Sequence, residues 1–275
     1  MNGPRRIRAA FDAAAADGRS ALIAYVMAGY PSGAEALGAA DAALSGGADM
    51  LEVGVPFSDP MADGPTIAEA GRVALAGGAG LSSARDLVTS LRRRGRDQPI
   101  MVMTYLNPLL AAGEDRTLRS LRAAGADGII VPDLPAGESP RLERVAASCG
   151  LAISFLVAPN TAPARVEAAI AASTGFVYVV PLFGVTGARE SVADGAVRLL
   201  GAVRSQASGR VPVAAGFGLS SPEAVAQLAP VADGLIVGSA LVAAMRDGGS
   251  DHLADLVRAL AAATTRARLA RDVTS

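Results

Sequence analysis

Two carboxylates, Glu52 and Asp63, are the side chains best suited to chemistry in this sequence. Glu52 interrupts the apolar run Met50–Val55, and Asp63 lies in the proline-rich loop 56–65, which also holds Asp59. A carboxylate in apolar surroundings has a raised pKa, which suits a general acid or base near neutral pH. The alternative for Glu52 is a structural carboxylate bonded to polar groups of the interior. Either Asp59 or Asp63 could instead cap a turn or the helix that begins near Thr66.

The composition excludes most other kinds of catalytic group. All 25 basic residues are Arg, so a Schiff-base lysine, a pyridoxal-phosphate lysine and a Walker-type phosphate loop are excluded. The single His (His252) and the single Cys (Cys149) cannot form a zinc site together, and His252 lies far along the chain for a Ser-His-Asp triad. Proton transfer must therefore fall to Asp, Glu or Tyr, and we expect no metal and no cofactor.

Charge and hydropathy narrow the class of protein. The net charge is −1 with dispersed basic residues, which predicts no binding of nucleic acid. The mean hydropathy is +0.36, yet no apolar run approaches the roughly 20 residues that cross a bilayer, and the N-terminus resembles no signal peptide. These features predict a cytoplasmic protein. The arginine cluster at 92–96 is typical of a solvated helix end.

Short apolar runs alternate with Ala-, Leu- and Arg-rich helical patterns along the 275 residues. The expected strands are Ala21–Met27, Met50–Val55, Ile100–Thr104, Gly128–Val131, Ala152–Val157, Phe176–Val180, Val211–Ala215 and Gly234–Val237. The expected helices are Pro4–Ala16, Ala34–Leu44, Ala84–Arg93, Thr117–Ala124, Ser139–Ser148, Ala164–Ala172, Val192–Ser205, Pro222–Leu228 and Asp251–Arg271. An Asp precedes a buried strand at three helix-to-strand junctions, 46–49, 124–128 and 232–234.

This repeat predicts an α/β protein, a (β/α)₈ TIM barrel of a single domain over residues 1–275 with an extra N-terminal helix. A doubly wound sheet is the alternative, but no GxGxxG follows the first strand. Strand alternation places Met50, Glu52 and Gly54 on the inner face of the barrel. Active sites of this fold lie at the carboxyl ends of the strands, where Glu52 and the loop 56–65 are expected.

Three late loops have the composition of a phosphate site. Glycine-rich segments at 184–187, 216–221 and 238–240 follow the sixth, seventh and eighth expected strands. Glycines let backbone N–H groups approach an anion, and a helix N-terminus adds favourable partial charge. The alternative is ordinary turn glycines. We expect a small phosphorylated substrate, bound without lysine.

These segments together resemble the tryptophan synthase α-subunit family. The most specific match is LEVGVPFSDPMADGPTI at residues 51–67. The supporting motifs, in family order, are YLNP (105–108), IIVPDLP (129–135), FVYVV…GVTG (176–187), GFGLSSPE (216–223) and IVGSA (236–240). The resemblance covers most of the chain from Tyr25 onward. It implies a retro-aldol cleavage of indole-3-glycerol phosphate to indole and glyceraldehyde 3-phosphate, in tryptophan biosynthesis.

The resemblance also assigns roles to individual residues. Glu52 matches the catalytic glutamate that moves protons between indole C3 and the glycerol hydroxyl, and Asp63 matches the aspartate that bonds the indole N–H. Tyr178 matches a tyrosine near the glutamate, and Asp59 becomes a structural loop residue. Substrate contacts are implied for Tyr25, Tyr105, Thr186, Gly187, Gly218, Gly238 and Ser239.

The family acts as an α₂β₂ complex with a pyridoxal-phosphate-dependent β subunit, so the resemblance implies that partner. Segments 56–65 and 105–110, and Asp133, match regions that face it. The chain departs from the family pattern at 181–183 and at Tyr30, which bears on loop closure and on coupling to the partner. Two alternatives remain open: a free-standing lyase of secondary metabolism, and a binding subunit that chiefly activates its β partner.

Overall fold

Parallel strands and helices alternate along the computed structural model, which describes residues 1–180, 192–216 and 218–266. The strands are β1 Ala21–Met27, β2 Met50–Gly54, β3 Ile100–Met103, β4 Gly128–Ile130, β5 Ala152–Ser154, β6 Leu156–Val157, β7 Val177–Val179, β8 Val213–Gly216 and β9 Gly234–Val237. The helices are α1 Gly3–Ala16, α2 Gly33–Ser45, α3 Pro65–Ala76, α4 Leu81–Arg93, α5 Leu106–Ala112, α6 Glu114–Ala124, α7 Pro140–Cys149, α8 Pro163–Ala172, α9 Val192–Ala207, α10 Pro222–Leu228 and α11 Ser239–Ala263.

The sheet closes into a barrel. Its strand order is β5-β4-β3-β2-β1-β9-β8-β7-β6, with every pairing parallel. The two end strands, β5 and β6, are halves of one run separated only by Phe155. The run therefore pairs with β4 through one half and with β7 through the other, which joins the two ends of the sheet. The predicted (β/α)₈ barrel and its eight strand positions are confirmed.

Three helical regions differ from the prediction. The sequence pattern predicts only that a helix begins near Thr66, whereas α3 spans Pro65–Ala76, and it predicts no helix at the position of α5. The expected closing helix Asp251–Arg271 instead begins at Ser239 and ends at Ala263. Two adjacent glycines hid its first half, because Gly249 (φ 69°) kinks the helix and lowers its helical signal.

Side chains of the strands divide into two layers, as period-two alternation requires. Met50 packs inside the barrel with Ile23 and Met101, in one cluster with residues of α1. Leu51 and Val53 face outward and pack against the surrounding helices. Glu52 therefore shares the inner face with Met50, as predicted.

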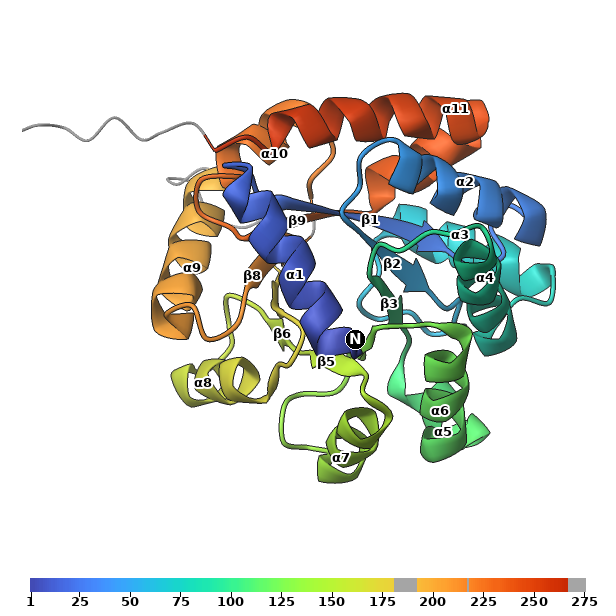
Figure 1. Cartoon of the computed structure of the whole chain (residues 1–275), viewed down its shortest axis with the longest axis horizontal. Helices are drawn as coiled ribbons and strands as arrows, with labels where there is room; N and C mark the ends of the chain where they lie inside the picture. The colour runs from blue at the N-terminus through green and yellow to red at the C-terminus, as the bar shows by residue number, and fades with distance from the viewer. Residues whose placement is uncertain (181–191, 217, 267–275) are drawn as a thin grey trace, which may run out of the picture.

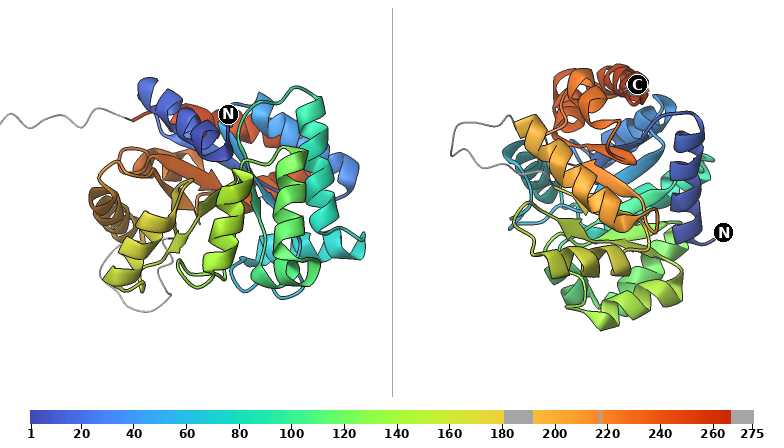
Figure 2. Two further views of the ribbon diagram at one scale, coloured as in Figure 1. Left: turned by 60° about the horizontal axis from the view of Figure 1, so that its bottom comes forward. Right: turned by 90° about the vertical axis from the view of Figure 1, so that its left-hand side faces the viewer.

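Helix α1 covers the amino-terminal end of the barrel. It lies across the strands in Figure 1 and along one side of the molecule in the right-hand view of Figure 2. Its Ile7, Phe11 and Ala14 are buried in the inner cluster, where the Phe11 ring contacts that of Phe176 at 5.8 Å between centroids. With this end covered, the opposite end, where the strands finish, is the one open to a ligand.

The three aspartates at the helix-to-strand junctions connect neighbouring strands. Each aspartate side chain accepts a hydrogen bond from a backbone N–H near the start of a neighbouring strand. Asp49 bonds Leu22 of β1 at 2.8 Å, Asp127 bonds Ile100 of β3 at 2.9 Å, and Asp233 bonds Val213 of β8 at 3.0 Å. Each also pairs with at least one Arg: Arg19, Arg92 and Arg204, respectively. These charge-assisted bonds satisfy the buried ends of the strands and fix their register. At the third junction α10 ends at Leu228 with Ala229 as its C-cap residue.

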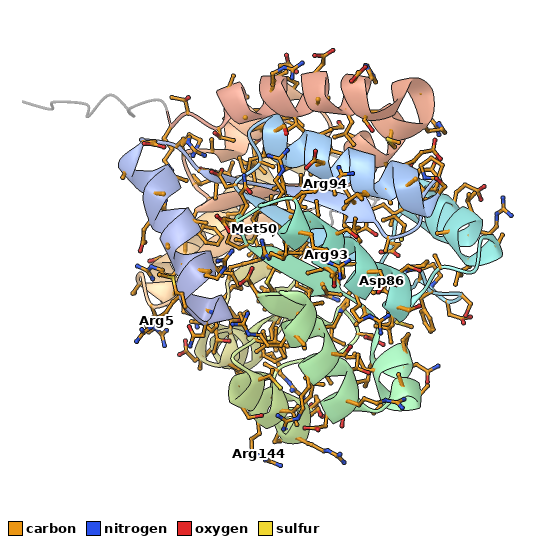
Figure 3. The ribbon with its side chains drawn as sticks, turned by 45° about the vertical axis from the view of Figure 1, so that its right-hand side comes forward. Arg5, Met50, Asp86, Arg93, Arg94 and Arg144 are labelled. Atoms are coloured by element: carbon orange, nitrogen blue, oxygen red, sulfur yellow. The ribbon has the colours of Figure 1, made fainter. Side chains whose placement is uncertain are left out.

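The arginine cluster at 92–96 also makes ion pairs with neighbouring elements. Arg92 reaches the buried Asp127 at 2.7 Å, while Arg94 and Arg96 pair with Asp41 of α2 at 3.5 and 2.6 Å. Arg94 is labelled near the end of α4 in Figure 3. The cluster is thus a helix end that binds its neighbours, with three of its arginines in ion pairs.

Of the helices in the described ranges, none combines the length and the apolar character needed to cross a membrane.

Candidate active site

A cavity of about 420 Å³ opens at the carboxyl ends of the strands. It is lined by Tyr25, Glu52, Asp63, Gly64, Pro65, Thr66, Ile67, Met103, Tyr178, Gly218, Leu219, Ile236, Gly238 and Ser239. These residues come from β1, β2, β3, β7 and β9, from the loops that follow β2, β8 and β9, and from the first turns of α3 and α11. The volume suits a small molecule, and the mostly apolar walls with few polar groups are typical of a ligand site.

Glu52 is the most unusual polar residue of the cavity. Its side chain is fully buried, and neither carboxylate oxygen has a hydrogen-bond partner among the described residues. Burial, and then the charge of Asp63, raise the pKa of Glu52 to about 8. A carboxylate held this way costs stability unless it is neutral, so Glu52 is mainly protonated at pH 7 and can donate a proton.

Asp63 stands on the loop between β2 and α3, facing the same cavity. Its backbone N–H donates to the carbonyl of Pro60 at 3.0 Å, which closes a turn just before the helix begins at Pro65. Burial raises the pKa of Asp63 to about 6, and a side-chain hydrogen bond with Tyr105 lowers it in part. Asp63 is therefore mainly anionic at pH 7, where Glu52 is mainly neutral. Two carboxylates whose pKa values are separated in this way can act as an acid and a stabilising anion.

Two tyrosines of the cavity lie against glycines. A Cβ atom at Gly54 would fall 2.0 Å from the hydroxyl oxygen of Tyr25, and one at Gly216 would fall 2.3 Å from that of Tyr178. Burial, followed by the neighbouring carboxylates, holds the pKa of each phenol well above its usual value. Both hydroxyls therefore keep their protons beside Glu52 and Asp63.

Gly54→Ala is expected to lower kcat/KM roughly tenfold or more and to destabilise the fold by about 1–3 kcal/mol, since the new methyl group must displace the ring of Tyr25. Gly201→Ala is the matched control, because a Cβ there meets no atom within 4 Å and the residue lies in α9. Kinetics and thermal melts of the two variants check this. Wild-type behaviour of Gly54→Ala would show that the Tyr25 position is not required.

The end of the cavity formed by residues after β8 and β9, the anion end, carries backbone groups suited to an anion. Gly238 and Ser239 begin α11, whose first turn has no side-chain cap, and Gly218 (φ 77°) is exposed beside them. Free N–H groups of a helix N-terminus bind phosphate well. Among the residues that the structure describes, no arginine lines the cavity, so this described part offers a phosphate mainly backbone donors.

The structure thus brings together Glu52, Asp63, Tyr178 and Tyr25 with the three residues of the anion end. Thr186 and Gly187, and the segment 181–183, lie outside the described residues. Asp59 is exposed and accepts a hydrogen bond from the Ser58 hydroxyl at 2.5 Å, away from the cavity lining.

Tyr105 does not line the cavity. It is buried behind the loop 56–65, where its hydroxyl accepts a hydrogen bond from the N–H of Ala62 at 3.0 Å. Its expected contact with substrate stays a prediction.

Sequence reasoning missed the apolar wall of the cavity. Ile67, Met103, Leu219 and Ile236 line the same cavity as the carboxylates and the anion end. Met103 could have been found as the last residue of β3, because this fold places such residues at the active-site end. The other three required knowledge of where the loops run. An aromatic ring would fit against these side chains.

A closed barrel of this kind, with a neutral and an anionic carboxylate in one cavity, defines a (β/α)₈-barrel enzyme of the carboxylate acid–base class. The sequence profile of the family described as "Tryptophan synthase alpha chain" matches residues 11–271. The chain belongs to the tryptophan synthase α chain family, and it is a lyase.

Individual relatives agree over nearly the whole length. The tryptophan synthase alpha chain of Deinococcus radiodurans is 45% identical over 258 residues, covering 92% of this chain and 94% of that one. The alpha chain of Mycobacterium avium is 43% identical over 257 residues, covering 94% and 93%. A solved structure of Mycobacterium tuberculosis tryptophan synthase superposes with a TM-score of 0.87 at 41% identity, covering 95% of this chain and 99% of that one.

Proposed function

We propose that Glu52 and Asp63 carry out the reaction of this family, the cleavage of indole-3-glycerol phosphate to indole and glyceraldehyde 3-phosphate. The observation that carries the proposal is Glu52, a fully buried carboxylate whose oxygens have no partner among the described residues. Such a group is costly to the fold, and its use as a proton donor to substrate accounts for its presence.

In the proposed mechanism, neutral Glu52 donates its proton to indole C3, which places a positive charge on the indole ring at N1. Anionic Asp63 binds the N1–H and stabilises that charge. The Glu52 carboxylate then takes the proton of the glycerol hydroxyl next to the ring, and the carbon–carbon bond breaks. The hydroxyl-bearing carbon leaves as an aldehyde, the bonding electrons return to the ring, and Glu52 ends protonated as it began. Tyr178, beside Glu52, helps to define the position of the ring.

The remaining cavity residues fit the rest of the substrate. The apolar wall would pack against the indole, with Tyr25 beside it. The phosphate would bind at the backbone of Gly218, Gly238 and Ser239. The family resemblance adds Thr186 and Gly187 to this end. The proposed chemistry needs only side chains of this chain. We place the chain in the cytoplasm, as a single domain.

A pyridoxal-phosphate-dependent β subunit is the proposed partner, in an α₂β₂ complex. Two large apolar side chains support a docking face beside the cavity: Met61 is 82% exposed on the loop 56–65, and Leu110 is 55% exposed on α5. Both lie in segments that match the partner-facing regions of the family, and exposed apolar side chains there are what a protein interface would cover. The free-standing lyase and the purely activating subunit gain no support from the relatives, which are named as alpha chains of tryptophan synthase.

Indole release from indole-3-glycerol phosphate tests the function. We expect the purified chain alone to form indole slowly and a tryptophan synthase β subunit to increase the rate, since loop closure over a site is commonly completed by a partner. Strong activity without any increase would support the free-standing lyase. Absence of indole both with and without the β subunit would refute the proposed reaction.

A further inference from the structure

Tyr105 connects the loop 56–65 to the body of the barrel. Its ring is buried and stacks on that of Phe57, with 5.0 Å between centroids and 30° between planes. Its hydroxyl accepts a hydrogen bond from the N–H of Ala62 at 3.0 Å. One side chain thus holds both ends of the loop, and its second contact is with the residue directly before Asp63.

The backbone that carries Tyr105 is itself fixed. Tyr105 is the residue before α5, and the first N–H of that helix, on Leu106, donates to both carboxylate oxygens of Asp133 at 2.9 and 3.2 Å. An acidic side chain at a helix N-terminus is favourable in charge as well as in hydrogen bonding. Tyr105 therefore projects from a rigid element rather than from a second loop.

The Tyr105 hydroxyl has one proton to give. A phenol can donate one hydrogen bond and accept others, and Ala62 occupies an accepting position. The Asp63 carboxylate, on the residue directly after Ala62, interacts with this phenol and is the acceptor that we infer for its proton. Burial and the charge of Asp63 raise the pKa of Tyr105 above its usual range, so the phenol keeps this proton.

We propose that Tyr105 is a positioning residue for the reaction: its hydroxyl, held by the Ala62 N–H, orients the Asp63 carboxylate toward the cavity. This inference rests on the role of Asp63 under the proposed function. It gives Tyr105 an action through Asp63, because Tyr105 lies outside the cavity lining. A carboxylate that must meet the indole N–H needs one orientation, and an exposed loop cannot supply it alone.

Tyr105→Phe tests the proposal, since it removes the hydroxyl and keeps the ring that stacks on Phe57. We expect kcat to fall roughly tenfold, the loss expected for one hydrogen bond to a charged group, with KM changed less than about threefold. The bond lowers the pKa of Asp63, so its removal should move the acid limb of the kcat/KM profile to higher pH. The control is Thr89→Val, which removes a hydroxyl whose hydrogen bond stays within α4, to the carbonyl of Arg85 at 2.9 Å, and should change neither kcat nor the acid limb.

The groups that interact with Asp63 make the pH readout specific. Glu52 reaches it from β2, Tyr25 from β1 and Tyr178 from β7, and each stays in place in Tyr105→Phe. A fall in kcat with an unmoved acid limb would mean a merely structural role and would overturn the proposal, as would unchanged kinetics. Thermal melts establish that the variant is folded at the assay temperature.

Asp63→Asn separates this proposal from the one on which it rests. If Asp63→Asn is nearly inactive and Tyr105→Phe causes no further loss in that background, the hydroxyl acts through Asp63, as proposed. If Tyr105→Phe still lowers kcat tenfold in the Asp63→Asn background, Tyr105 acts by another route and the positioning role is wrong. Full activity of Asp63→Asn alone would instead refute the role of Asp63, and the positioning role with it.

Discussion

Replacement of Glu52 by Gln is expected to lower kcat for indole formation by about 10³-fold or more and, at pH 8, to make the folded protein more stable. Gln has nearly the same shape but cannot donate a proton to indole C3 or take one from the glycerol hydroxyl. Loss of a positioned acid and base that serves both steps removes general acid–base catalysis worth roughly 10²–10⁴-fold. The indole assay measures the first effect, and denaturant unfolding at several pH values measures the second.

The stability effect has a definite sign. The pKa of Glu52 is about 8 in the folded protein against an ordinary value of 4.5, so the unfolded chain loses its proton first as pH rises. The folded state is therefore penalised progressively between pH 4.5 and 8, by an amount on the order of a few kcal/mol. Glu52→Gln removes this penalty. It should resemble the wild type near pH 4.5 and exceed it in free energy of unfolding at pH 8.

Glu167→Gln is the control for this prediction, because Glu167 is half-exposed on α8, outside the cavity lining, and pairs with Arg210 at 2.9 Å. It should retain indole formation and follow the wild-type dependence of stability on pH. Two results would contradict the role of Glu52: substantial indole formation by Glu52→Gln, or an unfolding free energy that stays parallel to the wild type from pH 4.5 to pH 8.

The position of Glu52 could be predicted from the sequence because it depends on local rules. Period-two alternation within one short strand decides which side chains face inward, and the repeat of strands and helices decides that inward means the barrel. The absence of Lys then leaves carboxylates as the main proton-transfer groups. The structure adds what alternation cannot show, namely that no described residue bonds the Glu52 carboxylate.

The position of Tyr105 could not be predicted, for a physical reason. Whether it touches substrate or the loop depends on the path of residues 56–65, which is decided by long-range contacts such as Ala62 N–H to Tyr105. The missed helix α5 has the same origin. It is short and contains Pro108, and the carboxylate that binds its first N–H comes from Asp133, outside the local sequence. Its local helical signal is therefore weak. Local pattern thus determines the barrel and its inner face, whereas the loops that complete the site depend on tertiary contacts.

Replacement of Asp63 by Asn is expected to lower kcat by roughly 10²–10³-fold, since it removes the negative charge that stabilises the protonated indole while leaving a hydrogen-bond acceptor in place. Asp59→Asn is the matched control: it makes the same change in the same loop, at an exposed carboxylate outside the cavity lining. The assay should use the isolated chain, because the loop also forms part of the proposed docking face. Equal kinetics of the two variants would refute the assigned role of Asp63.

The same variant should also change how Glu52 titrates. The charge of Asp63 contributes to the raised pKa of Glu52, although burial contributes more. In Asp63→Asn the Glu52 pKa should therefore fall below about 8 and remain above 4.5, so the loss of stability with rising pH should finish at a lower pH. The unfolding free energy measured across this range reports the shift without any substrate. If the pH at which this loss of stability finishes does not change, the two carboxylates do not interact through their charges. Their division into a neutral acid and an anion would then rest on burial alone.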